Sequence, residues 1–157
     1  MASIPRVAAI YISPGHNYYG HYGQPAGEHR VISVPKIECI AGKGLIGDRY
    51  FDHKENYKGQ ITFFAWETYE DLCRRFGVTD KHPGVFRRNI ITCDVDLKLW
   101  IGKEFEIQGV LFTGTQESAP CSWMNQAFCE GAEVAMKGRG GLRARIVTDG
   151  FLKVDEP

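Results

Sequence analysis

The chain has 157 residues and a mass of 17.7 kDa, which is a usual size for one domain and is enough to bury a hydrophobic core. Hydrophobic residues make up 43% of the sequence and charged residues 24%, a balance that excludes intrinsic disorder and fibrous folds. The 19 basic and 19 acidic residues cancel, so the chain has no overall field that would attract nucleic acid.

The N-terminal part predicts two strands. β-Branched and apolar residues at positions 6–13 predict the first, and a loose alternation over 30–40 predicts the second. The longest early apolar run, residues 7–12, is far shorter than the ~20 residues of a membrane span, and no signal-peptide cleavage pattern follows it. We therefore expect a cytoplasmic protein that is not bound to a membrane.

The segment between these two strands combines glycine, histidine and tyrosine at positions 15–23. This composition suits a surface loop that approaches a ligand, and it also suits a plain mobile loop. The sequence leaves both interpretations open.

The remaining pattern predicts short strands around one clear helix. An apolar run at 61–64 predicts a strand, and helical spacing from Trp66 to a stop at Gly77 predicts the helix. Further strands are predicted at 90–93, 103–107, 110–115 and 143–148, with room for a second helix at 122–136. Short strands separated by glycine turns favour a mainly β fold with a few helices, either a barrel or a sandwich, in a single domain spanning 1–157.

The five cysteines are an odd set without a Cys-x-x-Cys pair, namely Cys39, Cys73, Cys93, Cys121 and Cys129. This pattern fits neither a disulfide framework nor a zinc ribbon, so we expect reduced thiols. Cys73 and Cys129 are assigned to packing. Cys121 follows Pro120 where a helix begins, and there the helix dipole and nearby arginines would favour a thiolate, which is both a nucleophile and a soft metal ligand. The alternative is an inert buried thiol.

Arginine and glycine gather in three segments: Gly47-Asp48-Arg49, residues 86–89 and residues 139–145. Guanidinium groups suit phosphate or carboxylate, and Gly140-Gly141 would let backbone N–H groups approach an anion. These segments suggest a phosphorylated small ligand, although the arginines could instead pair with surface carboxylates. His53 could donate a proton, but a surface histidine is the plainer interpretation. No Gly-x-Ser-x-Gly or His-Glu-x-x-His motif occurs, which argues against hydrolase and zincin chemistry.

Taken in order, these segments resemble the MOSC domain, the family related to the C-terminal domain of molybdenum-cofactor sulfurases. The resemblance runs over about residues 31–150. It rests on six features in register: Gly47-Asp48-Arg49, Gln60, Arg88-Asn89, Ile101-Gly102, Pro120-Cys121 and Arg139-Gly140-Gly141. The C-terminal residues, which read Lys153-Val154-Asp155-Glu156-Pro157, depart from the Gly-Asp with which family members often close.

The resemblance implies a MOSC-type β-barrel that binds the molybdenum cofactor, a molybdenum pterin dithiolene with a terminal phosphate. By analogy, Cys121 would be the catalytic residue and the molybdenum ligand, or the carrier of a persulfide. The residues expected to bind the cofactor are Arg49, Gln60, Arg87, Arg88, Asn89, Arg139, Gly140, Gly141 and Arg143. Asp48 would orient Arg49 rather than meet an anion.

The function implied by the resemblance is that of a molybdenum-dependent oxidoreductase that reduces N-hydroxylated small molecules. One alternative is a non-redox carrier of the cofactor, or of sulfur through a Cys121 persulfide. Another is a module whose arginines bind an unrelated phosphorylated metabolite. Because the sequence carries no desulfurase, iron–sulfur or flavin module, electrons or sulfur would come from a separate donor protein or cysteine desulfurase. The oligomeric state does not follow from the sequence.

Overall fold

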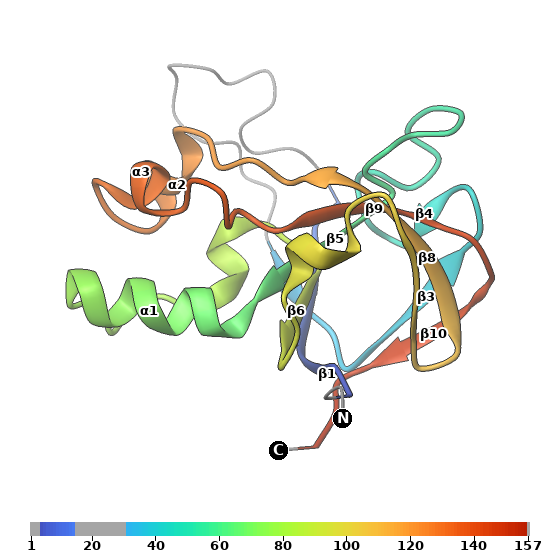
Figure 1. Cartoon of the computed structure of the whole chain (residues 1–157), viewed down its shortest axis with the longest axis horizontal. Coiled ribbons are helices and arrows are strands. Elements are labelled where there is room, and N and C mark those ends of the chain that lie inside the picture. The colour runs from blue at the N-terminus through green and yellow to red at the C-terminus, as the bar shows by residue number, and fades with distance from the viewer. Residues whose placement is uncertain (1–3, 15–30, 157) are drawn as a thin grey trace.

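The computed structural model describes residues 4–14 and 31–156, so the loop predicted at 15–23 lies outside the described residues. The described chain is mainly β with a few helices, as expected (Figure 1). Its elements, with 3-10 helices labelled η, are β1 (Arg6–Ile12), β2 (Ile32–Ser33), β3 (Lys36–Ile40), β4 (Gly44–Leu45), β5 (Ile61–Ala65), α1 (Trp66–Phe76), η1 (Pro83–Phe86), β6 (Ile90–Cys93), η2 (Leu97–Trp100), β7 (Glu104–Ile107), β8 (Val110–Glu117), α2 (Trp123–Ala127), α3 (Ala132–Ala135), β9 (Leu142–Ile146) and β10 (Gly150–Lys153).

The described strands form two sheets. A seven-stranded sheet has the order β2-β1-β6-β5-β9-β8-β7, and a three-stranded sheet has the order β10-β3-β4. Neighbouring strands are antiparallel apart from β5 and β6, which are parallel and are connected by α1. A parallel pair needs such a crossover because the chain must return to the same end of the sheet. The carboxyl ends of β5 and β6 therefore lie at one edge, beside the N-terminus of α1.

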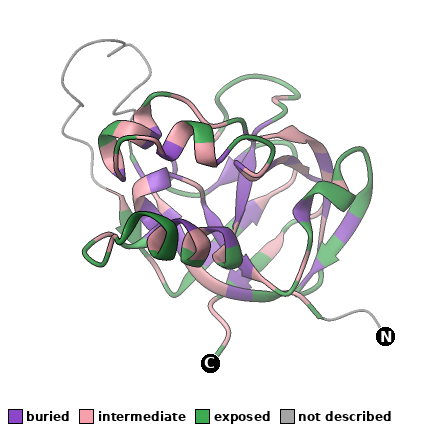
Figure 2. Ribbon diagram, turned by 60° about the vertical axis from the view of Figure 1, so that its left-hand side comes forward, coloured by how far each residue is buried: buried purple, intermediate pink, exposed green. Residues whose placement is uncertain are grey.

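The larger sheet is covered on both faces. Ile61 and Phe63 of β5 face a core shared with the three-stranded sheet, whereas Phe64 faces a second core under the helices. This alternation is the two-residue period of a strand that is buried on both sides. Figure 1 shows α1, α2 and α3 gathered on one side of the sheets, and Figure 2 shows the buried residues between these layers.

The expectation of a closed barrel is wrong for the described strands, whose two sheets do not join. A barrel requires a hydrogen-bond ladder that continues around the whole circumference. At β10 the side chain of Gln108, from the β7–β8 turn, replaces the next strand. Its amide donates to the Lys153 carbonyl oxygen at 2.9 Å and accepts from the Lys153 backbone N–H at 2.8 Å. These side-chain bonds cap the edge of the small sheet and end the ladder there.

The predicted strands and helices are largely confirmed, with two interruptions. The strand expected over 30–40 splits into β2 and β3 around Pro35, because proline has no N–H to donate to a ladder. The helix expected over 122–136 splits into α2 and α3, and Gly131 between them has a φ of 95°. Helix α1 ends as predicted at Gly77, whose left-handed backbone lets its N–H bond to the Cys73 carbonyl oxygen.

Two strands, β4 and β10, were not predicted from the sequence. β4 has only two residues, and β10 follows directly on Asp149 near the end of the chain. Among the described helices, none has the length and apolar character needed to cross a membrane.

Candidate functional site

The candidate site is organised around Arg88, which follows η1. Its guanidinium donates to the carbonyl oxygens of Gly140 and Ser118, both at 2.9 Å, of Phe86 at 3.2 Å and of Ala119 at 3.3 Å. Ser118 and Ala119 lie just before Cys121, and Gly140 lies just before β9. Arg88 therefore ties the segment that carries Cys121 to the segment that leads into β9.

Electrostatics place three further predicted residues near Arg88. Burial and, secondarily, Arg143 and Arg49 lower the pKa of Arg88 to about 10, while Cys121 opposes this lowering. A guanidinium with this pKa is still protonated at neutral pH. Cys121, Arg143 and Arg49 thus all lie close enough to Arg88 to change its pKa, although they come from distant parts of the sequence.

Gly140 and Gly141 are required by close packing. A Cβ atom at Gly140 would overlap the carbonyl oxygen of Ser118, and one at Gly141 would overlap that of Phe63. Gly141 also has a φ of 115°, which side-chain-bearing residues rarely adopt. The Gly140 N–H, predicted to face an anion, donates to the Glu117 carboxylate at 3.1 Å. Both glycines therefore shape the site by letting backbone segments approach.

Arg49 and Arg87 form a second pair beside Arg88. Arg87 is buried and donates to the Ser13 hydroxyl at 2.7 Å. Burial and, secondarily, Arg49 lower the pKa of Arg87 to about 10, while Asp48 opposes this lowering. Arg49 contacts the Asp48 carboxylate at 3.5 Å and stacks on the Tyr50 ring at 4.8 Å. Asp48 also accepts the Ser13 N–H at 3.0 Å, so it orients Arg49 as predicted while holding the end of β1.

Cys121 is a half-buried free thiol between β8 and α2, packed against the second core. The residue after it, Ser122, is the N-cap of α2, and the Cys121 carbonyl oxygen accepts the Met124 N–H at 3.0 Å. Because α2 has only five residues, its dipole is small, and Arg88 is a charged group that interacts with Cys121. The thiol therefore lies at the start of a helix with an arginine nearby, the two features that the sequence indicated for it.

An aromatic group borders this region; the sequence had indicated only His53, which is exposed as its plainer interpretation expected. The Tyr50 and Tyr57 rings stack at 5.4 Å, and His53 contacts both, at 5.4 and 4.8 Å. Burial raises the pKa of Tyr57, Tyr50 raises it further, and Arg143 and Arg49 oppose these effects. The two tyrosines therefore lie near the same arginines. The signal in the sequence was the pair of tyrosines closely following Gly47-Asp48-Arg49.

The side chains of Asn89 and Gln60 make their described hydrogen bonds to other residues of the protein. The Asn89 side-chain oxygen accepts from the N–H and the hydroxyl of Thr62, both at 3.0 Å, and its amide donates to the Tyr11 carbonyl oxygen at 3.1 Å. The Gln60 side-chain oxygen accepts the Ile146 N–H at 2.8 Å. These residues join β1, β5, β6 and β9 beneath the site.

The two arginines around β9 point to different places. Arg139 donates from Nε to the Ala135 carbonyl oxygen at 2.9 Å and pairs with Asp71 of α1 at 2.8 Å. Its guanidinium is thus held at α1 rather than beside Arg88. For Arg143, no described residue accepts a hydrogen bond from the guanidinium. Arg143 therefore keeps all its guanidinium donors available among the described residues, whereas Arg49 uses two of its donors in long contacts with the Asp48 carboxylate and the Arg87 carbonyl oxygen.

Packing assigns the other thiols. Cys39 is fully buried in the first core, where burial and, secondarily, Glu38 raise its pKa to about 12. Cys73 and Cys129 pack against the second core, as expected, and burial raises the pKa of Cys129. Within residues 4–14 and 31–156, no group of three His, Cys, Asp or Glu side chains could hold a metal ion.

Comparison with known families gives one match. The family model for the MOSC domain matches residues 42–157. The matched segment contains Arg49, Arg88, Cys121 and Arg143. A search of curated proteins found no match to the chain.

Solved structures share the fold at low sequence identity. The YuaD protein from Bacillus subtilis superposes with a TM-score of 0.70 at 14% identity, covering 96% of this chain and 91% of that chain. YiiM from Geobacillus stearothermophilus gives a TM-score of 0.67 at 14% identity, covering 98% of this chain and 73% of that chain. YiiM from Escherichia coli gives 0.60 at 20% identity, covering 91% and 66%, respectively.

Proposed function

Because the chain belongs to the MOSC domain family, we propose that it binds the molybdenum cofactor beside Cys121 and reduces N-hydroxylated small molecules. The observation that carries this proposal is the convergence of Cys121, Arg49 and Arg143 on the segments tied together by Arg88. Thiol and guanidinium groups are the side chains that the sulfur-rich metal centre and the phosphate of this cofactor require.

The charge of the region fits such a ligand. Arg49 interacts electrostatically with Arg87 and Arg88, and Arg143 interacts with Arg88. Among the described residues, the carboxylates at these segments are Asp48, which pairs with Arg49, and Glu117, which accepts the Gly140 N–H. The excess positive charge favours a bound anion. Cys121 adds a soft donor next to that charge, and a cofactor that brings its own sulfur ligands would complete the coordination of a metal.

In this proposal the chain's residues divide into two roles. Cys121 holds the molybdenum, and Arg49 and Arg143 bind the phosphate and pterin. Arg87, Arg88, Asn89, Gln60, Gly140 and Gly141 position those groups through the contacts described above. Arg139, which the family pattern also points to, contributes through its place beside Gly140 rather than through its guanidinium, which pairs with Asp71.

The bound cofactor would supply the two-electron chemistry that removes oxygen from an N-hydroxyl group, giving the amine and water with two protons and two electrons. The protein's part is to anchor the cofactor and exclude competing ligands. In this proposal the electrons come from a separate donor protein in the cytoplasm. A sulfur-carrier function would instead need a cysteine desulfurase as partner.

Turnover with an artificial electron donor tests the proposed activity. The protein is reconstituted with molybdenum cofactor and supplied with reduced methyl viologen and an amidoxime, and formation of the amidine is measured. We expect turnover in the wild type and in Cys129→Ser, and none in Cys121→Ser. Cofactor retention without turnover would contradict the reductase activity and favour a carrier of the cofactor or of sulfur. Absence of both would contradict cofactor binding itself.

A further inference from the structure

Two half-buried thiols, Cys73 and Cys129, lie on segments that contact each other although they are distant in the sequence. Cys73 belongs to α1, and Cys129 lies in the connection between α2 and α3. Both are free cysteines, and both pack against the second core. The proposed reductase uses neither thiol, which leaves both available for a chemistry of their own.

The connection that carries Cys129 lies directly against α1. A Cβ atom at Gly131, two residues after Cys129, would lie 3.2 Å from the Phe76 ring, so the backbone at this glycine touches that ring. Phe76 is three residues after Cys73, and residues at this spacing are neighbours on the surface of a helix. Cys129 therefore lies next to the side of α1 that carries Cys73.

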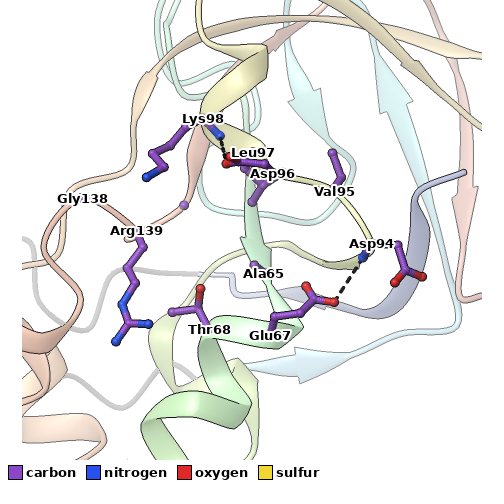
Figure 3. A pocket seen from close by; sticks show the side chains of 11 residues that line it. Ala65, Glu67, Thr68, Asp94, Val95, Asp96, Leu97, Lys98, Gly138 and Arg139 are labelled. Carbon is purple, nitrogen blue, oxygen red and sulfur yellow. Dashed lines mark hydrogen bonds between the residues drawn. The ribbon is translucent and has the colours of Figure 1, made fainter. Parts of the chain in front are cut away.

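The backbone around both thiols is held in place. Cys73 is inside the hydrogen-bonded helix α1, and the Cys129 carbonyl oxygen accepts the N–H of the fully buried Ala132 at 3.1 Å. Farther along the same segment Arg139 pairs with Asp71 of α1 at 2.8 Å, and Figure 3 shows its side chain extending toward this helix. The segment that follows Cys129 is thus attached to α1 at a second point.

The two thiols are near each other and open to small reagents. Burial and, secondarily, Glu130 and Cys73 raise the pKa of Cys129. A contribution from Cys73 requires that the two thiols lie at short range. Cys73 also lines an open groove of about 540 Å³ beside Tyr69, so a dissolved oxidant can reach it. Cys39, by contrast, is fully buried in the first core.

We propose that Cys73 and Cys129 form a reversible intramolecular disulfide on exposure to a low-molecular-weight disulfide such as oxidised glutathione. The thiolate of one cysteine attacks a glutathione sulfur and releases one reduced glutathione. The second thiolate then attacks the protein sulfur of this mixed disulfide and releases the other. The two protein thiols lose two electrons and two protons, which the oxidised glutathione gains as it becomes two thiols.

The disulfide joins α1 to the connection between α2 and α3. It involves neither Cys121 nor the molybdenum cofactor, so it is tested on the cofactor-free protein, and its failure would leave the proposed reductase function untouched.

Peptide mapping tests the link. The protein is incubated with excess oxidised glutathione at about pH 8.5, where more of each thiol is ionised than at neutral pH. Free thiols are then alkylated in acid and the chain is digested. Two of the five thiols should resist alkylation, and a peptide pair joined through Cys73 and Cys129 should appear and be lost on reduction. Because a disulfide needs Cα atoms within about 7 Å of each other, the joined pair is a strict test of their placement.

Cys73→Ser and Cys129→Ser should each abolish the link and leave the other cysteine as a thiol or a mixed disulfide with glutathione. Circular dichroism checks that each variant is folded. The matched control is Cys93→Ser, because Cys93 is another half-buried thiol but lies at the end of β6. It should form the link as fully as the wild type. The proposal is overturned if the wild type keeps all its thiols or yields only mixed disulfides, if the link joins two molecules, or if another cysteine replaces either partner.

Discussion

Two groups of polar residues meet at the Cys121 region, and they differ in where their donors go. The Arg88 guanidinium donates to four carbonyl oxygens. The described hydrogen bonds of the Asn89 side chain also go to groups of the protein. Arg143, by contrast, donates to no described acceptor. Residue type alone therefore does not identify a ligand-binding arginine, because backbone carbonyl oxygens can accept the hydrogen bonds that its guanidinium would otherwise donate to a ligand.

This contrast defines a scaffold, Arg88 with Asn89, and a rim, Arg143 with Cys121. Replacing a scaffold residue leaves buried backbone groups without partners and should lower the free energy of unfolding. Replacing a rim residue should weaken cofactor binding and leave that free energy nearly unchanged. The following variants can separate or merge the two groups.

The largest loss of stability is expected for Arg88→Met. Methionine retains much of the aliphatic length but leaves the carbonyl oxygens of Gly140 and Ser118 without their 2.9 Å bonds. We expect the free energy of unfolding to fall by at least about 3 kcal/mol. Urea denaturation followed by circular dichroism measures this change. A loss below about 1 kcal/mol would place Arg88 with the rim.

Asn89→Ala should have the next largest effect. It removes bonds to Thr62 and Tyr11 from a residue that is 3% exposed, and it separates the ends of β1, β5 and β6. A loss of about 2 kcal/mol is expected in the same unfolding measurement. If Asn89→Ala instead unfolds like the wild type and loses the cofactor, its role is ligand binding.

Arg143→Gln should behave in the opposite way. Because its guanidinium has no described acceptor, we expect the free energy of unfolding to change by less than about 0.5 kcal/mol. Retention of the cofactor after gel filtration should fall about tenfold relative to wild type, as for loss of one charged hydrogen bond to phosphate. Arg145→Gln is the matched control on β9, since Arg145 donates to the Asn56 carbonyl oxygen. Equal retention by both variants would remove Arg143 from the rim.

The smallest effect is expected at Arg139, which belongs to neither group. The hydrogen bond from Arg139 lowers the pKa of the Asp71 carboxyl below its ordinary value. A lowered pKa contributes stability that is present above the unfolded value and is lost as the pH falls through the folded value. The wild type should therefore lose slightly more stability than Asp71→Asn as the pH falls below about 4. Parallel pH dependences of unfolding would show that the ion pair contributes nothing.

The parts of the fold set by local patterns could be predicted from the sequence. Helix α1 followed from the spacing of its apolar residues and the glycine after Phe76. The Gly140-Gly141 pair was expected to let backbone N–H groups approach an anion, but the groups that approach these glycines are backbone carbonyls of distant segments. A pattern in the sequence cannot report which groups fold against it.

The role of Arg88 could not be predicted, because its acceptors lie 52 and 30 residues away in Gly140 and Ser118. The ion pair of Arg139 could not be predicted for the same reason, because its partner Asp71 lies far away in the sequence on α1. The strand pattern left a barrel and a sandwich open, and the closed barrel was implied by the resemblance to the MOSC domain. The Gln108 side chain that ends the ladder at Lys153 gave no signal in that pattern.

The most direct test of the account is the ratio of molybdenum to protein after reconstitution with molybdenum cofactor under reducing conditions and removal of the excess. Wild type and Cys121→Ser are compared, with Cys129→Ser as the control, because Cys129 is a partly buried thiol of the same core. We predict a near-equimolar ratio in wild type and control, and loss of molybdenum in Cys121→Ser with unfolding unchanged. Equal molybdenum in all three proteins, or none in any, would contradict a cofactor held by Cys121.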